Sequence, residues 1–179
     1  SHKNKSIILG GGLGLIPALT YKKSKNEVLV FEINKKIVKN LKKNLIQNNI
    51  KFKIFINNLV HKKTKNKYFF FTKDFLATSS KVKTKNKVLV KNLEKNKIKN
   101  FKTFNTLILD IEGDEEYYIL NIKKYNNIKY LFFELHHNII SEDRVLSIMN
   151  TLKFNGYKLI DKCFNSYYFE KKVSNRYYK

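Results

Sequence analysis

A cluster of glycines near the start of the chain narrows the folds that it can adopt. Four of its six glycines lie in the segment Gly10-Gly11-Gly12-Leu13-Gly14. The apolar run before it, residues 6–9, indicates a buried strand, and residues 15–24 after it indicate a helix. A glycine loop between a strand and a helix turns sharply and lets backbone N–H groups approach a ligand. Because a simple tight turn does not need four glycines, we interpret this segment as a binding loop.

Strands and helices alternate along most of the chain. Short apolar runs bounded by turn residues mark the strands, and apolar residues recurring every three or four positions mark the helices. Further strands are expected at residues 27–32, 52–56, 106–111, 128–135, 157–161 and 167–170. Further helices are expected after Asn34, at about residues 115–122, and from Ser141 to Gly156. This order predicts a single α/β domain over residues 1–179, with a doubly wound, mainly parallel, seven-stranded sheet that ends in an antiparallel hairpin.

The middle of the chain is less regular. Residues 68–71 and 88–90 indicate two strands with a polar, lysine-rich connection, and residues 93–101 are interpreted as a short helix. No apolar stretch is long enough to span a bilayer. The single cysteine, Cys163, allows no internal disulfide and fits a reducing compartment, so we expect a cytoplasmic protein.

The net charge of +23 raises the possibility of a nucleic-acid or anionic-membrane partner. Two features weigh against it. Arg144 and Arg176 are the only arginines, although the planar guanidinium is the group that reads phosphates and bases best. Lysine is also spread along the chain together with abundant Asn, Ile, Phe and Tyr, a composition typical of AT-rich codons. Nucleic acid is therefore the less favoured partner.

Glu32 ends the second expected strand and is the natural acidic partner of the glycine loop. An acid at this position can accept hydrogen bonds from both hydroxyls of a ribose. The dinucleotide pattern G-x-G-x-x-G does not fit, because it needs glycine at Leu15 or at Pro17. The compact pattern G-x-G-x-G fits the alternate glycines Gly10, Gly12 and Gly14. It resembles motif I of the class I S-adenosylmethionine-dependent methyltransferases, whose cofactor has no phosphates.

Five of the 14 acidic residues lie in the run Asp110-Ile-Glu-Gly-Asp-Glu-Glu116. Asp110 and Glu112 are two positions apart at a strand end, so their side chains can share one side, and Gly113 lets the chain turn after them. We interpret Asp110 and Glu112 as catalytic candidates. The three acids that follow are interpreted as first-turn residues of a helix, where they complement its dipole.

Glu134, His136 and His137 end the next expected strand, which should lie beside the first. Period two places Glu134 and His136 on one side. With Asp110 and Glu112 they could act as a general base, as substrate ligands or as an oxygen-rich metal site, and no metal is assigned. His136 suits the removal of a proton at neutral pH, so it is the third catalytic candidate.

The order of these motifs resembles that of the FkbM-family methyltransferases. The run TLILDIEGDEEYYIL resembles the family signature L-x-x-D-x-E-G-x-E, and IKYLFFELHHNI resembles the next strand with its terminal Glu and His. VLVKNLEKNKI and GYKLIDKCFNSYYFEKK resemble the segments before and after these two. Together with the glycine loop and EVLVFEINKKIVKNLKKNL, the resemblance covers nearly the whole chain.

The resemblance implies transfer of a methyl group from S-adenosylmethionine to a hydroxyl of a small molecule, sugar or lipid. It implies cofactor binding by Gly10, Gly12, Gly14 and Glu32, with Asn57 or Asn58 near the adenine. It places Asp110 and Glu112 along the cleft.

One position departs from the pattern. Ile8 stands where methyltransferases usually carry an acid that contacts the methionine part of the cofactor. Two alternatives therefore stay open: a nucleic-acid enzyme or binder that uses the basic surface, and a domain that keeps the fold without catalysis. The acceptor and the oligomeric state are not determined by the sequence.

Overall fold

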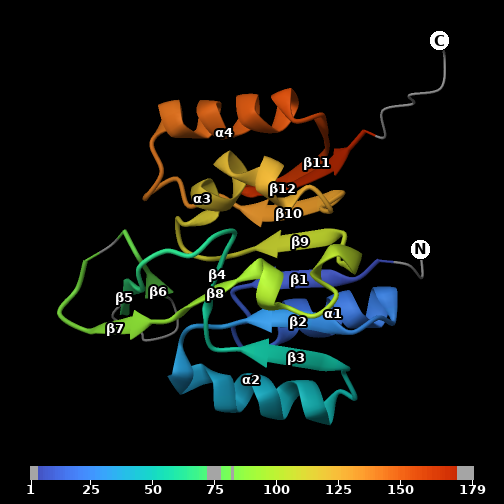
Figure 1. The fold of residues 1–179 in the computed structure, drawn as a ribbon, viewed down its shortest axis with the longest axis vertical. Helices are drawn as coiled ribbons and strands as arrows, with labels where there is room; N and C mark the ends of the chain where they lie inside the picture. Colours follow the sequence, from blue (N-terminus) through green and yellow to red (C-terminus); the bar gives the residue numbers. More distant parts are fainter. Residues whose placement is uncertain (1–3, 72–77, 82, 173–179) are drawn as a thin grey trace.

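A computed structural model describes residues 4–71, 78–81 and 83–172 of the chain. A seven-stranded sheet forms its centre, in the order β11-β12-β10-β9-β1-β2-β3 (Figure 1). The strands are β1 (Ser6–Leu9), β2 (Val28–Phe31), β3 (Phe52–Phe55), β9 (Thr106–Leu109), β10 (Tyr130–Glu134), β11 (Tyr157–Cys163) and β12 (Ser166–Lys171). The five strands from β3 to β10 are parallel, and β12 runs antiparallel to both of its neighbours. The predicted doubly wound sheet with a closing hairpin is confirmed.

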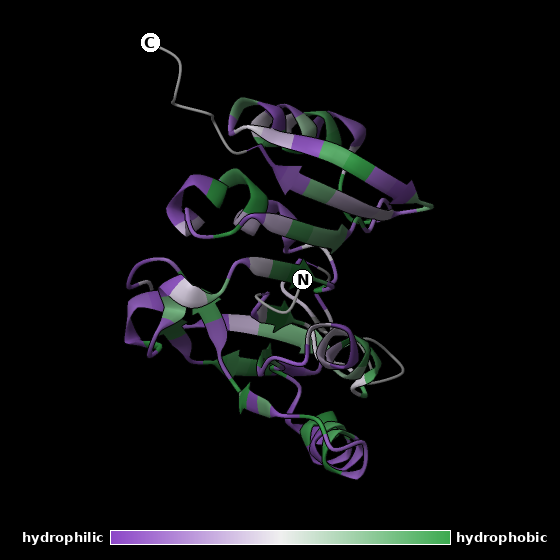
Figure 2. Ribbon diagram, turned by 90° about the vertical axis from the view of Figure 1, so that its right-hand side faces the viewer, coloured by the Kyte–Doolittle hydropathy of each residue, from purple (hydrophilic) through white to green (hydrophobic). Residues whose placement is uncertain are grey.

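The central strands are mainly apolar because helices cover both of their faces. All four residues of β1 are at most 2% exposed. In the register of the sheet, Ile8 lies between Val30 of β2 and Ile108 of β9. A strand buried on both faces is a continuous apolar run rather than an alternation of polar and apolar residues. This is why the sequence predicts these strands. In Figure 2 the strands at the centre are correspondingly green.

Two helices pack on one face of the sheet. They are α1 (Leu15–Ser24) and α2 (Lys35–Gln47), and α2 presents the predicted apolar stripe that includes Leu41 and Leu45 to β1 and β2. The side chain of Asn34 caps α2 by accepting a hydrogen bond from the Lys36 N–H at 3.1 Å. Burial of this stripe, rather than intrinsic propensity, holds a helix as rich in lysine and asparagine as α2 in place.

The other face carries α3 (Glu115–Leu120), the 3-10 turn η3 (Ile122–Tyr125) and α4 (Glu142–Phe154). These elements enclose the larger apolar cluster with β9, β10 and β12. The predicted helix at 115–122 is therefore an α-helix of six residues followed by a 3-10 turn. The predicted helix from Ser141 is confirmed, and Gly156 follows its end with φ +81°. None of the helices in the described ranges combines the length and the apolar character that a membrane crossing needs.

The chain between β3 and β9 forms a separate insertion, which lies to one side of the sheet in Figure 1. Its strands β4 (Asn58–Val60) and β8 (Asn92–Glu94) pair in parallel. Strand β5 (Lys67–Phe71) pairs antiparallel with β6 (Thr78–Ser79) and β7 (Lys87–Val90). The predicted strands at 68–71 and 88–90 are confirmed within one or two residues.

The predicted helix at residues 93–101 is wrong. Its first residues belong to β8, and the rest forms the 3-10 turns η1 (Lys95–Lys97) and η2 (Phe101–Thr103). Pairing of Leu93 with Leu59 of β4 fixes an extended backbone at the start, and Asn100 interrupts a helix with φ +58°. The strand pairing is non-local, so the local apolar spacing could not reveal it.

Two buried tyrosines allow a matched test of this core. Tyr125 is fully buried, and its hydroxyl has no hydrogen-bond partner among the described residues. The hydroxyl of Tyr118 donates to the Leu59 carbonyl at 2.8 Å. Because an unpaired buried hydroxyl costs free energy, we expect Tyr125→Phe to raise the free energy of unfolding by ~1 kcal/mol and Tyr118→Phe to lower it by ~1–2 kcal/mol. Urea unfolding measures both; equal losses would contradict the assignment.

Candidate functional site

The glycine loop lies at the carboxyl end of β1, between the ends of β2 and β9. The Gly10 N–H donates to the Phe31 carbonyl at 2.9 Å. Gly10 has φ +86°, and a Cβ at this position would lie 1.7 Å from the Asp110 carbonyl oxygen. No side chain fits there. Since the sheet reverses its order at β1, this is the topological switch point at which open α/β sheets bind ligands.

The other three loop positions are occupied by glycine for different structural reasons. A Cβ at Gly11 would lie 2.5 Å from Val30 Cγ1 and 2.9 Å from Leu41 Cδ2, so Gly11 lets the loop pack on β2 and α2. The G-x-G-x-G pattern did not single out Gly11. Gly12 has φ +50° and open space where its Cβ would be, and Gly14 is the N-cap residue of α1 with φ +101°. Gly12 is therefore the loop glycine with room for a ligand.

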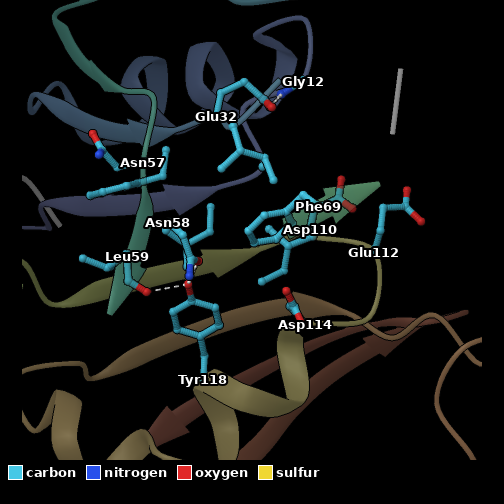
Figure 3. A pocket seen from close by; sticks show the side chains of 15 residues that line it. Gly12, Glu32, Asn57, Asn58, Leu59, Phe69, Asp110, Glu112, Asp114 and Tyr118 are labelled. Atoms are coloured by element: carbon cyan, nitrogen blue, oxygen red, sulfur yellow. Dashed lines mark hydrogen bonds between the residues drawn. The ribbon is translucent and has the colours of Figure 1, made fainter. Parts of the chain in front are cut away.

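Glu32 lies directly beside the loop and is 5% exposed. Its Oε2 accepts a hydrogen bond from the Gly12 N–H at 3.0 Å, and its Oε1 accepts one from the Asn34 N–H at 2.8 Å (Figure 3). Burial raises the pKa of this carboxyl, while the backbone donors Asn34, Gly12 and Gly11 oppose the rise. The structure thus brings the predicted loop and the predicted acid together.

A cleft opens next to Glu32. The predicted residues that line it are Gly10, Gly12, Glu32, Asn57, Asn58, Asp110 and Glu112. In Figure 3, Glu32 and Gly12 lie on one side of the cleft, and Asp110 and Asp114 lie opposite. Gly14 is not among the lining residues, because its part is to start α1.

The insertion and α3 supply further lining residues that the sequence did not reveal. Phe69 of β5 is 4% exposed and closes one end, and Tyr118 of α3 reaches the floor. The Tyr118 hydroxyl donates to Asn58 Oδ1 at 3.1 Å, and Asn58 Nδ2 donates to Asn92 Oδ1 at 2.9 Å. Asn58 is therefore held in place by protein contacts. Asn57 Nδ2 donates to the Lys91 carbonyl at 3.2 Å.

Asp110, Glu112 and His136 come together at the ends of β9 and β10. His136 Nε2 lies 3.5 Å from Glu112 Oε2 and 3.9 Å from Asp110 Oδ1. Glu112 has φ +54°, and the Ser79 hydroxyl of the insertion donates to its carbonyl at 2.7 Å. The three catalytic candidates thus form one cluster, whereas His137 is exposed.

Glu115 contacts His136 and the backbone that carries Glu112. It is fully buried, and its two oxygens accept hydrogen bonds from the backbone N–H groups of Ile111 at 2.9 Å and Gly113 at 2.8 Å. Its Oε1 also lies 3.1 Å from His136 Nδ1. The sequence interpretation of Glu115 as a first-turn acid is confirmed but incomplete, because its contact with a residue 21 positions away was not visible locally.

The cluster shifts the pKa values of its members. The hydrogen bond to Glu115 is the main reason why the pKa of His136 rises to about 9. Burial, followed by the nearby Glu134 carboxylate, raises the pKa of Asp110 to about 6. His136 therefore carries a proton at neutral pH in this arrangement, so the expected neutral-pH base is better sought among the carboxylates.

The remaining acids of the run are paired with basic side chains. Asp114 lies 3.0 Å from Lys67 Nζ and accepts a hydrogen bond from the Ser80 hydroxyl at 2.6 Å. Glu116 lies 2.7 Å from Lys81 Nζ and 2.5 Å from Arg144 Nε. These contacts tie α3 to the insertion and to α4.

Asp110 also borders a second groove on the other side of β9. Glu134 lies in this groove with the stacked rings of Phe132 and Tyr168, whose centroids are 4.2 Å apart. Ile8 is fully buried in the apolar cluster beneath α1 and α2 and does not line the cleft.

Comparison with known proteins assigns the fold. No protein-family model and no curated protein sequence matches the chain. Among solved structures, ribosomal protein L11 methylase from Lactobacillus delbrueckii subsp. bulgaricus is similar, with a TM-score of 0.56 and 11% identity over 94% of this chain and 70% of that one. Fibrillarin in a complex with Nop5p has a TM-score of 0.56 and 9% identity over 97% of this chain and 74% of that one.

TrmK from M. capricolum, bound to S-adenosylhomocysteine, has a TM-score of 0.52 and 13% identity over 93% of this chain and 60% of that one. The chain has the Rossmann-like fold of the class I methyltransferases. At these identities the similarity concerns the fold, and it does not single out the FkbM family.

Two glycine substitutions test the loop geometry. We expect Gly10→Ala to lower the free energy of unfolding by at least ~3 kcal/mol, because it adds a clash with the Asp110 backbone to the cost of positive φ. We expect Gly12→Ala to lower the free energy of unfolding by only ~1 kcal/mol, because positive φ is its only cost. Urea unfolding of both variants gives the comparison, and a Gly10→Ala loss no larger than that of Gly12→Ala would contradict the close approach.

Proposed function

We propose that the protein is an S-adenosylmethionine-dependent methyltransferase that methylates a hydroxyl oxygen. The observation that carries the proposal is the buried Glu32 carboxylate, held beside Gly12 at the edge of the cleft. The backbone N–H groups of Gly12, Asn34 and Gly11 occupy three of the roughly four acceptor positions of this carboxylate, so it keeps acceptor capacity for a ribose hydroxyl of a nucleoside. The class I fold and the S-adenosylhomocysteine bound by the similar TrmK structure support this choice of nucleoside.

The charge of the cleft also favours this cofactor over a nucleotide. Four carboxyl groups line it, from Glu32, Asp110, Glu112 and Asp114, and no Lys or Arg of the described chain does. Lys67 neutralises Asp114, so the negative charge of the lining comes from Glu32, Asp110 and Glu112. Phosphate groups would be repelled by this lining, whereas the sulfonium and ammonium groups of S-adenosylmethionine would be attracted. Asn57 and Asn58, which begin the insertion after β3 and line the same cleft as Glu32, are proposed to lie near the adenine.

Asp110 separates the cofactor cleft from the second groove, and we assign that groove to the acceptor. A hydroxyl oxygen arriving there would attack the methyl carbon; the O–CH₃ bond forms, the S–CH₃ bond breaks, and S-adenosylhomocysteine leaves. The hydroxyl proton passes to a carboxylate of the Asp110, Glu112 and His136 cluster. The stacked rings of Phe132 and Tyr168 offer an apolar surface, and acids as well as Lys162 line the groove, which suits an organic acceptor as expected from the FkbM resemblance.

Isothermal titration with S-adenosylmethionine tests the proposal. We expect one site per chain, and we expect Glu32→Ala to weaken binding by ~10- to 100-fold, because a buried ribose loses charged acceptors. Glu27→Ala, at the opposite end of the same strand region, serves as the control and should leave affinity unchanged. Absence of heat at millimolar cofactor, or equal affinity of both variants, would refute the assignment of the cleft.

A nucleic-acid substrate is the second candidate, and the net charge of +23 favours it. Lysine side chains would attract any polyanion at low ionic strength, so binding alone is not informative. The acids around the cleft make us expect only non-specific binding.

Fluorescence anisotropy with a labelled single-stranded RNA decides between the two. At about 150 mM salt we expect a Kd no tighter than the ~1–100 µM of non-specific complexes, unchanged by added S-adenosylmethionine. Nanomolar binding at that salt concentration, strengthened by the cofactor, would instead favour RNA as the acceptor.

A further inference from the structure

The cluster of Asp110, Glu112 and His136 has the composition and spacing of a metal site. One side-chain ligand atom from each residue can be chosen so that all three lie within 4.8 Å of one another. Two carboxylate oxygens and one imidazole nitrogen converge from the ends of β9 and β10. Figure 3 shows Asp110 and Glu112 at the same end of the cleft.

The orientation of His136 is set by a residue outside the cluster. Glu115 Oε1 lies 3.1 Å from His136 Nδ1, so the Nδ1–H donates to this carboxylate and Nε2 faces Asp110 and Glu112. Glu115 is itself immobilised by two backbone N–H groups and is fully buried. A carboxylate that fixes the ring and the tautomer of a histidine from behind is the usual support of a metal-binding imidazole.

The local charge gives an independent indication. Asp114 and Glu116, in the same acidic run, are each neutralised by a lysine or arginine. Asp110 and Glu112, in contrast, share the single imidazole of His136 as their charged partner and form no ion pair with Lys or Arg in the part of the chain that the structure describes. In a chain with a net charge of +23, this point keeps an excess of negative charge.

We propose that Asp110, Glu112 and His136 Nε2 bind one divalent cation, which displaces the Nε2 proton of His136 to solvent. Mixed carboxylate and imidazole ligands suit Mn²⁺ or Zn²⁺ better than Mg²⁺ or Ca²⁺, which prefer oxygen alone. Three protein ligands leave coordination positions open for water or an acceptor. Each carboxylate offers one oxygen to the cation and keeps the other for the acceptor proton. The role of the cation in placing the acceptor hydroxyl rests on the proposed methyltransferase function; its binding does not.

Mn²⁺ binding by the full chain tests this site directly. The free ion is quantified by room-temperature electron paramagnetic resonance, without cofactor or acceptor. We expect one Mn²⁺ per chain, and we expect Glu112→Gln and His136→Gln each to weaken binding by at least ~10-fold. Glu134→Gln is the matched control, because it removes a nearby carboxylate that is not a proposed ligand; a small change in affinity is expected.

Circular dichroism establishes that the variants remain folded. No Mn²⁺ binding at millimolar concentration, or equal weakening by Glu134→Gln and Glu112→Gln, would overturn the site, since the latter indicates only general attraction. Titration of the same samples with S-adenosylmethionine separates the two proposals. Cofactor binding without Mn²⁺ binding refutes the cation site alone, and Mn²⁺ binding without cofactor binding refutes the methyltransferase alone.

Discussion

The close approach of the Gly10 backbone to the ends of β2 and β9 is the contact on which the site depends. The Phe31 carbonyl accepts its N–H, and the Asp110 carbonyl occupies the space that a Cβ would need. Because the loop is pressed between these two strands, Glu32, which follows β2, and Asp110, which follows β9, face each other across one cleft. Packing of Gly11 on β2 and α2 completes the constraint. These contacts bring the glycine loop after β1, Glu32 after β2 and Asp110 after β9 to one cleft.

The site is acidic although the protein is strongly basic. Lysines cover the surface, while carboxylates collect at the carboxyl ends of β2, β9 and β10. Buried acids are tolerated there because each has defined partners: backbone N–H groups for Glu32 and Glu115, and basic side chains for Asp114 and Glu116. Under the proposed function, the local charge of the cleft would favour the cationic groups of the cofactor over phosphates, so the net charge of the chain is a poor guide to the substrate.

The insertion between β3 and β9 contributes side chains to the cleft and supports the residues around it. It places Phe69 and Asn58 on the wall of the cleft, and Ser79 stabilises the unusual backbone of Glu112 through its carbonyl. Lys67 and Lys81 of the same region hold α3 through Asp114 and Glu116. The similar solved structures share the fold at 9–11% identity. Under the proposed function, selectivity for the acceptor would depend on the insertion and on the aromatic groove beyond Asp110, because these lie next to the Asp110, Glu112 and His136 cluster.

The sequence by itself determined the sheet, the glycine loop with Glu32, and the acids Asp110 and Glu112, because apolar runs, turn residues and strand ends are local signals. Only the tertiary structure decided what depends on distant contacts. The pairing of β4 with β8 replaced the expected helix at residues 93–101, and the need for glycine at position 11 comes from Val30 of β2 and Leu41 of α2. Contact with Glu115 makes His136 a protonated, oriented ring rather than a free base at neutral pH. Local patterns record which backbone forms, whereas the pKa and direction of a side chain depend on neighbours that the fold brings from elsewhere in the chain.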